Sequence, residues 1–152
     1  MEAAVVRVGP GMKPQGLANT VWAYATQLWR PGAEARAALE AAVVRVGPDM
    51  DPQNVGNVLW SFATLGLIPG AAAWAALEAA AARVVRMSTD IVAQNATNTL
   101  WSFLILAATR GVALPKCYRQ LWRAVGRGLH SYTFRLNVST LCGIQWVHLG
   151  FQ

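Results

Sequence analysis

The stretch PQNVGNVLWSFATLG at residues 52–66 decides the fold, because it occurs in two further versions in this chain of 152 residues. PQGLANTVWAYATQL stands at residues 14–28, and AQNATNTLWSFLILA stands at residues 93–107. Each version has a tryptophan at the same position of the motif: Trp22, Trp60 and Trp101. The first spacing is 38 residues and the second is 41. Self-similarity at such a period is typical of arrays of helical repeats.

The segment between these versions repeats as well, since EAAVVRVGP occurs at residues 2–10 and again at 40–48. Each unit therefore has two parts, and both have helical character. In the first part, apolar residues recur every three or four positions, as helical packing requires, at Leu17, Val21, Ala25 and Leu28. The second part is rich in alanine, which has high helix propensity.

Turn residues mark the helix ends. Asp51 before Pro52 predicts a helix start in which the aspartate is the N-cap. The second helix of each unit is expected to begin after Pro31–Gly32, Pro69–Gly70 or Pro115. It is expected to end near Gly9–Pro10 and Gly47–Pro48.

A lone helical hairpin cannot bury its apolar stripe, so such units stack, and about three are needed for stability. The sequence predicts an all-α fold, an α-solenoid of helical hairpins with a period of about 38 residues, as a single array over residues 1–152. The expected units are 1–11 (half), 12–49, 50–87, 88–133 (with an insertion) and 134–152 (partial). We expect the chain to be a fragment of a longer array.

Composition limits the class of protein. Hydrophobic residues make up 55% of the chain and charged residues only 13%, against about 25% in typical soluble proteins. No apolar run reaches the roughly 20 residues of a membrane-spanning helix, so no membrane insertion is expected. Two cysteines, Cys117 and Cys142, make no disulfide framework. The start of the chain resembles neither a signal peptide nor a transit peptide.

The net charge of +6 is unevenly placed. Asp90 is the last acidic residue, and six lysines and arginines follow it. Such an imbalance favours a polyanionic partner, either a nucleic acid or an anionic membrane surface.

The pattern PQxxxNxxWxxAxLG, with its 38-residue period, resembles the octotricopeptide repeat of green-algal organelle proteins, which is related to the helical repeats of FAST kinase-like and RAP-domain proteins. The resemblance covers residues 12–107 well and the remainder loosely, and residues 145–152 resemble the segment that often precedes a RAP domain. It implies binding of single-stranded RNA in the chloroplast or mitochondrion, with each unit helping to read about one base. The implied role is RNA processing, stability or translation, alongside other organellar RNA-processing proteins.

Uncharged polar residues stand opposite the apolar stripe of each first helix, and their amides and hydroxyls suit base edges. Sequence reading needs positions that differ between units. We therefore expect base contacts from Thr20, Asn54, Ser61, Asn95, Thr99 and Ser102. The amides that repeat unchanged are expected to be structural: Gln15, Gln53, Gln94, Asn19, Asn57 and Asn98. The alternatives are that the first set is structural and that the repeated amides contact bases.

The repeated tryptophans have two interpretations. Trp22, Trp60 and Trp101 can stack on bases, as aromatic side chains do in single-strand binders. Their position beside the apolar stripe favours burial between helices. We also expect Trp74 and Trp122 to be packing residues of second helices.

Four cations predict a phosphate track. Lys116, Arg119, Arg123 and Arg127 follow one another at spacings of three, four and four residues, on one face of a helix without acidic neighbours. A solvated helix face is the alternative.

No catalytic arrangement is visible. GPGMKPQG at residues 9–16 lacks the order of a phosphate loop. The two histidines and two cysteines have no metal-ligand spacing, so we expect no metal, no cofactor, no small-molecule substrate and no enzymatic activity.

The sequence thus favours an RNA-binding helical-repeat protein. A protein–protein interaction scaffold of the α-solenoid type is the alternative, and a fragment that does not fold alone is a third possibility.

Overall fold

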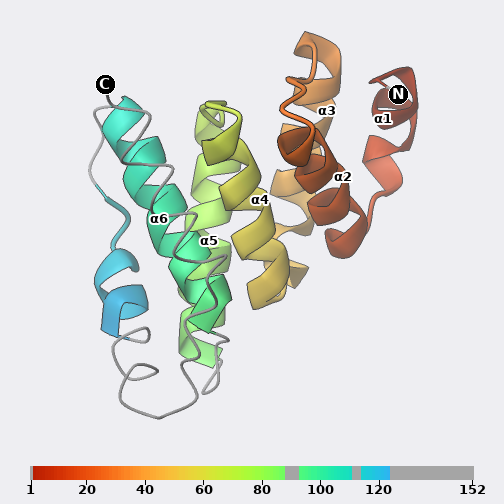
Figure 1. The fold of residues 1–152 in the computed structure, drawn as a ribbon. Helices are drawn as coiled ribbons and strands as arrows, with labels where there is room; N and C mark the ends of the chain where they lie inside the picture. Colours follow the sequence, from red (N-terminus) through yellow and green to blue (C-terminus); the bar gives the residue numbers. More distant parts are fainter. Residues whose placement is uncertain (1, 88–92, 111–113, 124–152) are drawn as a thin grey trace, which may run out of the picture.

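The structure is a computed structural model that describes residues 2–87, 93–110 and 114–123, and within these ranges every regular element is helical (Figure 1). The elements are α1 (Glu2–Val8), η1 (Gly9–Gly11), α2 (Pro14–Thr26), α3 (Ala33–Val46), η2 (Gly47–Asp49), α4 (Pro52–Thr64), α5 (Ala71–Met87) and α6 (Ala93–Arg110). Residues 118–123 are helical too. The expected all-α class is confirmed.

The helix ends follow the turn chemistry of the sequence. Asp51 caps α4, because its carboxylate accepts a 2.7 Å hydrogen bond from the Asn54 N–H. Gly32 is the N-cap of α3. α1 and α3 each end one residue before the glycine of a Gly-Pro pair, and a short 3-10 turn follows both.

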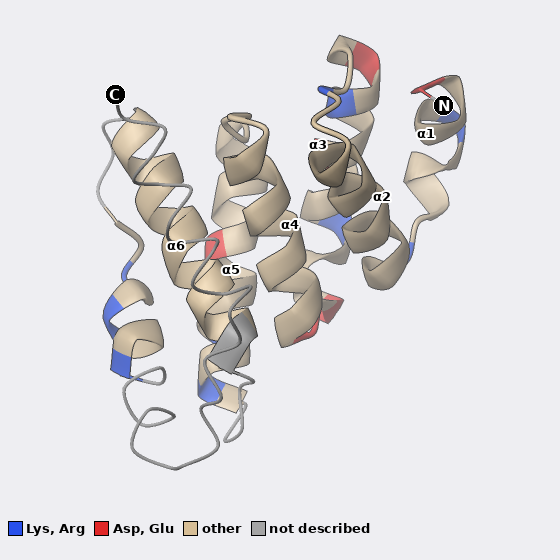
Figure 2. Ribbon diagram, in the orientation of Figure 1, with Lys and Arg blue, Asp and Glu red and all other residues tan. Residues whose placement is uncertain are grey.

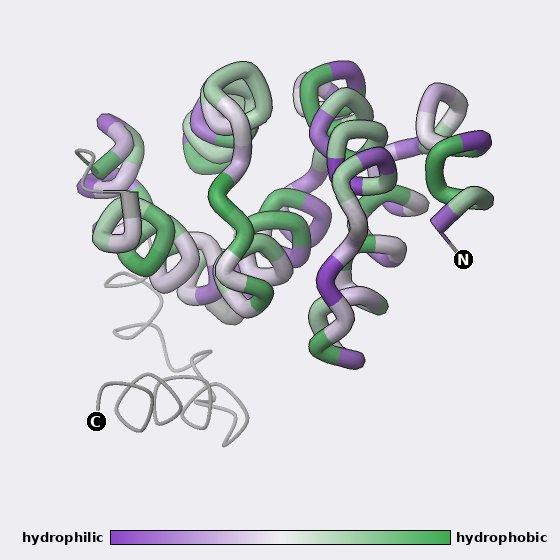
Figure 3. The backbone as a smooth tube through the Cα atoms, turned by 90° about the horizontal axis from the view of Figure 1, so that it is seen from above, coloured by the Kyte–Doolittle hydropathy of each residue, from purple (hydrophilic) through white to green (hydrophobic). Residues whose placement is uncertain are grey.

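The helices form two layers (Figures 1 and 3). α2, α4 and α6 lie side by side in the first layer, and α1, α3 and α5 lie side by side in the second. The first-layer helices are the first helices of the three sequence units. The segment 114–123 lies near α5, since the charges of Glu78 and Arg86 on that helix influence the pKa of the Cys117 thiol.

Contacts in the second layer recur at a 38-residue offset. The Glu2 carboxylate accepts a 2.7 Å hydrogen bond from the Gly32 N–H, and the Glu40 carboxylate accepts a 2.9 Å bond from the Gly70 N–H. Each bond joins a second helix to the N-terminus of the next one. Repetition in the sequence is thus matched by repetition of contacts.

Arginines make a second recurring contact. Arg45 donates to the carbonyl oxygens of Met12 (2.6 Å) and Gly9 (3.2 Å), and Arg83 donates to the carbonyl oxygen of Met50. Both guanidinium groups therefore satisfy backbone carbonyls at the end of the preceding second helix.

The core runs between the layers and contains most of the predicted apolar stripe. Leu17, Val21 and Ala25 are buried, as expected. Leu28 is 73% exposed, which corrects the prediction, because α2 ends at Thr26 and Leu28 lies in the turn that follows.

Some predicted features lie outside the described residues. They are most of the expected insertion, which falls around residues 86–90, the partial unit at 134–152, the side chain of Gln94, and Arg127.

Candidate nucleic-acid interface

The middle helix of the first layer, α4, has one narrow face that no other described helix covers. On α4 this face carries Gln53, which is exposed, followed by Asn57, Trp60 and Thr64, which are half-buried. The remaining residues of α4 after Gln53 are buried. Among the described elements, α2 and α6 enclose α4 on its sides and the second layer lies behind it, which leaves this stripe uncovered by them.

The neighbouring helices repeat the stripe. The corresponding residues of α2 are Gln15, Asn19, Trp22 and Thr26, and all four are exposed. On α6 they include Asn98, Trp101 and Ile105, all half-buried. We call this set of aligned side chains on α2, α4 and α6 the amide–tryptophan face.

The predicted base-reading residues are mostly not on this face. Ser61, Thr99 and Ser102 are buried, and Asn54 is only 9% exposed. The expectation that these four side chains lie on a solvent-facing surface is therefore wrong. Thr20 and Asn95 are half-buried.

The buried hydroxyls bond to their own helices. Ser61 donates to the Asn57 carbonyl oxygen (2.7 Å), Thr99 to that of Asn95 (2.7 Å) and Ser102 to that of Asn98 (2.6 Å). Such bonds to the residue four positions earlier let a hydroxyl be buried without losing its partner. These side chains serve the packing between helices.

Close packing of first-layer helices explains the burial. A methyl group at Gly56 of α4 would lie 3.3 Å from the Asn95 carbonyl oxygen and 3.6 Å from the Thr99 hydroxyl of α6. Thr20 of α2 occupies the position that corresponds to Thr99 of α6. It is half-buried, because within the described residues α2 has a first-layer neighbour on one side only.

The amides that repeat unchanged occupy the open face instead. Gln15, Asn19 and Gln53 are exposed, and their side chains make no hydrogen bond within the part of the chain that the structure describes. The structural role expected for these three side chains is therefore not seen. The spacing of Gln15, Asn19 and Trp22, four and then three residues, was a signal that they share one helix face.

The tryptophans lie at the boundary of the core rather than inside it. Trp22 is 48% exposed, while Trp60 and Trp101 are half-buried and pack against the core. Trp74 packs edge-on against Phe103, with ring centroids 5.6 Å apart. Trp122 is 65% exposed, so its expected role in packing is wrong.

The amide–tryptophan face is uncharged. α2 and α4 contain no charged residue, and α6 contains only Arg110 at its end. Figure 2 shows these three helices almost entirely without charge, whereas the charges lie on the second layer, on the segments that connect the helices and on the segment 114–123.

The predicted phosphate track is described in part. Lys116, Arg119 and Arg123 are exposed, and Cys117 and Leu121 are buried on the other side of the segment. None of the three cations has a salt bridge to a described residue. The track lies beside α5, on a different layer from the amide–tryptophan face.

Two groups have shifted pKa values. Burial raises the pKa of the Cys117 thiol to about 11, and the charge of Glu78 adds to this effect. Burial also raises the pKa of the Tyr24 hydroxyl, with a further contribution from the Glu2 carboxylate. Both side chains are therefore neutral at pH 7, and neither lies on the amide–tryptophan face.

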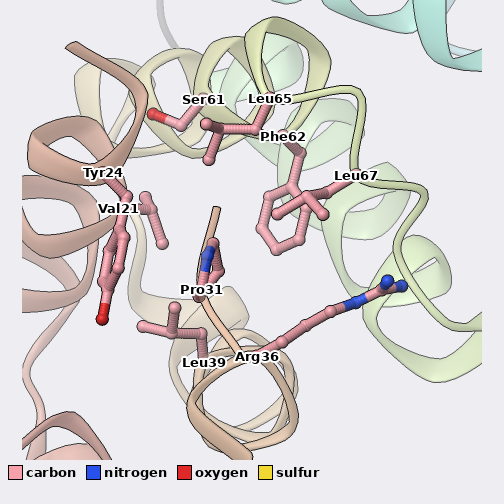
Figure 4. A pocket seen from close by; sticks show the side chains of 9 residues that line it. All are labelled: Val21, Tyr24, Pro31, Arg36, Leu39, Ser61, Phe62, Leu65 and Leu67. Atoms are coloured by element: carbon pink, nitrogen blue, oxygen red, sulfur yellow. The ribbon is translucent and has the colours of Figure 1, made fainter. Parts of the chain in front are cut away.

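A hollow between α2, α3 and α4 is mainly apolar (Figure 4). Val21 and Tyr24 of α2, Leu39 of α3 and Phe62 of α4 contribute to its walls. Its cavity volume is about 10 Å³, roughly the room for a single water molecule. We assign it no ligand.

Neither a metal site nor a membrane-spanning helix is found among the described residues. No three histidine, cysteine or acidic side chains gather there in a way that suits a metal ion. No helix in those same ranges is both long and apolar enough to span a bilayer.

Comparison of the chain with models of known protein families, with curated proteins and with solved structures found no match. The octotricopeptide resemblance thus stays an expectation that rests on the repeated motif alone.

Proposed function

We propose that this chain is an α-solenoid of roughly 38-residue units that binds single-stranded RNA on its amide–tryptophan face. The observation that carries the proposal is the recurrence of the same amides and tryptophans, all at least partly accessible to solvent where described, on successive helices of one layer.

The solenoid is supported by contacts that repeat with the sequence period. The Glu2–Gly32 and Glu40–Gly70 bonds are one example. Another is the close approach of Gly9 to Ala38 and of Gly47 to Ala76, with distances of 3.3 and 3.5 Å between the side-chain carbon of the alanine and a methyl group built on the glycine. Successive units are thus related by similar steps.

The chemistry of the face suits bases rather than phosphates. Each side-chain amide offers both donors and an acceptor, which complement base edges. A partly exposed indole ring offers a surface for base stacking, worth roughly 1–3 kcal/mol per base in single-strand binders. Helical-repeat readers of RNA use two or three side chains per unit in this way.

Phosphate neutralisation is assigned to the segment 114–123. Lys116, Arg119 and Arg123 are exposed and have no acidic partner among the described residues. They stand at the C-terminal end of the described part of the chain, so we assign them the phosphates of RNA that passes the face on that side. By the octotricopeptide resemblance, the setting is chloroplast or mitochondrial RNA processing, stability or translation.

A titration tests the proposal. The purified chain is mixed with labelled single-stranded RNA and, separately, with double-stranded DNA of equal length, at several salt concentrations. We expect tighter binding of the single-stranded RNA, which weakens as salt rises. Equal binding of the duplex, or no binding at low salt by a chain with intact helical circular dichroism, contradicts the proposal.

A protein-interaction scaffold is the second candidate. The lack of charge on α2 and α4 favours it, because interface cores are depleted of charged residues. In the same titration, a folded chain that ignores both nucleic acids favours the scaffold.

A further inference from the structure

We infer that the amide–tryptophan face recognises a run of one base, and that this base is adenine. The inference rests on the proposed RNA binding and adds to it the class of sequence that is bound.

The structure separates the variable positions from the repeated ones. On α4 the positions whose residue changes between units, such as Val58 and Ser61, are buried where first-layer helices touch, and Thr99 of α6 is buried as well. On α2 the equivalent Thr20 is half-buried. Positions that repeat unchanged, such as Asn19 and Asn57, retain access to solvent. A ligand on this face therefore meets the same asparagine and tryptophan at each step.

Identical readers select identical bases. Sequence discrimination by a repeat array requires different side chains in different units, since each unit reads its base through two or three contacts. Where Gln, Asn and Trp recur together, each unit has the same preference. The matching ligand is a homopolymeric tract.

The chemistry of the recurring group selects adenine. The inference concerns readout of the base edge that carries N7. There an Asn or Gln amide pairs with adenine in bidentate fashion, accepting from the N6 amino group and donating to N7. On the same edge guanine presents two acceptors, cytosine only a donor and uracil only an acceptor, so adenine alone offers a donor and an acceptor together. The indole beside each amide adds a stacking surface.

A homopolymer also relaxes the demands of spacing. Adjacent packed helices are roughly 8–10 Å apart, whereas stacked nucleotides advance by about 3.4 Å. A strand on this face must extend or skip bases between helices. In a run of adenines, the next unit meets an adenine whether or not bases are skipped between helices.

Competition among RNAs of equal length tests the inference. Labelled oligoadenylate, oligouridylate, oligocytidylate and a mixed sequence are titrated with the full chain at one low salt concentration. We expect oligoadenylate to bind most tightly, by roughly tenfold or more over the mixed sequence. The substitution Asn19→Ala removes one of the three repeated asparagines, so it should weaken oligoadenylate binding by roughly tenfold and reduce this preference in part.

The matched control is Gln27→Ala. Gln27 is an exposed amide just after α2 but outside the amide–tryptophan face, so its loss should leave the preference unchanged. Circular dichroism of both variants checks that they fold.

The outcomes separate the inference from the proposed function. Equal affinity for all single-stranded RNAs, or a preference for oligouridylate or oligocytidylate, overturns the adenine assignment but leaves RNA binding intact. An Asn19→Ala variant that is folded and keeps the full preference overturns it as well. Failure of every RNA to bind the folded chain overturns the proposed function together with the inference.

Discussion

The Glu40 carboxylate accepts a 2.9 Å hydrogen bond from the backbone N–H of Gly70, thirty residues along the chain. The same carboxylate forms a 2.8 Å ion pair with Arg36. One side chain thus ties the start of α5 to α3 and supplies a partner for an N–H group that no helix bond satisfies.

Glu40→Ala should therefore lower the free energy of unfolding by about 2 kcal/mol, since a hydrogen bond to a charged acceptor is lost. Urea denaturation followed by circular dichroism measures this change. Glu34→Ala, at an exposed site on the same helix, is the control and should have little effect. Equal effects of the two substitutions would show that the Glu40–Gly70 bond does not hold the units together.

The backbone conformation of the turn after each first helix leads to a second prediction, about stability. Gly66 after α4 has φ +60°, and Leu28 after α2, at the equivalent position, has φ +50°. The left-handed conformation costs a non-glycine residue roughly 1–2 kcal/mol. Leu28 is mostly exposed, so its replacement loses little burial.

Leu28→Gly is expected to stabilise the fold by about 0.5–1 kcal/mol, after the entropy cost of glycine is subtracted. Gly66→Ala should destabilise it by about 1 kcal/mol. Thermal melts of both variants test the pair. A lower melting temperature for Leu28→Gly would contradict the assigned backbone conformation.

Cys117 predicts a pH dependence of stability. Burial raises the pKa of its thiol from 9.0 to about 11 in the folded chain. The thiol of the unfolded chain ionises first as pH rises, so the stabilisation is full below pH 9 and is lost between about pH 9 and pH 11. Denaturation at a series of pH values should show a shallower decline for Cys117→Ala. Identical profiles for the two proteins would contradict the burial of this thiol.

The exposed Arg119 leads to a prediction about how RNA binding depends on salt concentration. Three exposed cations that contact phosphates of single-stranded RNA give a log–log salt slope of roughly −2, at about 0.7 per contact. Arg119→Gln should reduce that slope by about 0.7, measured by titration at several salt concentrations. Arg7→Gln, an exposed site at the other end of the chain, is the control. An unchanged slope for Arg119→Gln would remove this segment from the interface.

Much of the fold was predictable from local chemistry. The helix-start pair Asp51–Pro52, the Gly-Pro stops and the apolar spacing of Leu17, Val21 and Ala25 each predict a feature that the structure contains. These signals are local, since they depend on capping and on helical periodicity. The failure at Leu28 has the same origin, because the periodic pattern continues past the residue at which the helix ends.

The candidate site was predicted less well, because exposure depends on how the helices pack. A single helix viewed alone has one apolar face and one open face, and on that view Ser61 and Thr99 belong to the open face. Three helices side by side bury both flanks of the middle one, which leaves only the stripe with Asn57 and Trp60 accessible. The accessible side chains of the motif can therefore be identified only when the arrangement of the helices in layers is known.

The side-chain amide signals of the asparagines test the central claim most directly, by nuclear magnetic resonance during a titration with single-stranded RNA. The account predicts that the signals of Asn19, Asn57 and Asn98 shift on binding, while that of the buried Asn54 changes little. Shifts confined to residues 114–123, or an equal response of Asn54, would contradict an RNA interface on the amide–tryptophan face.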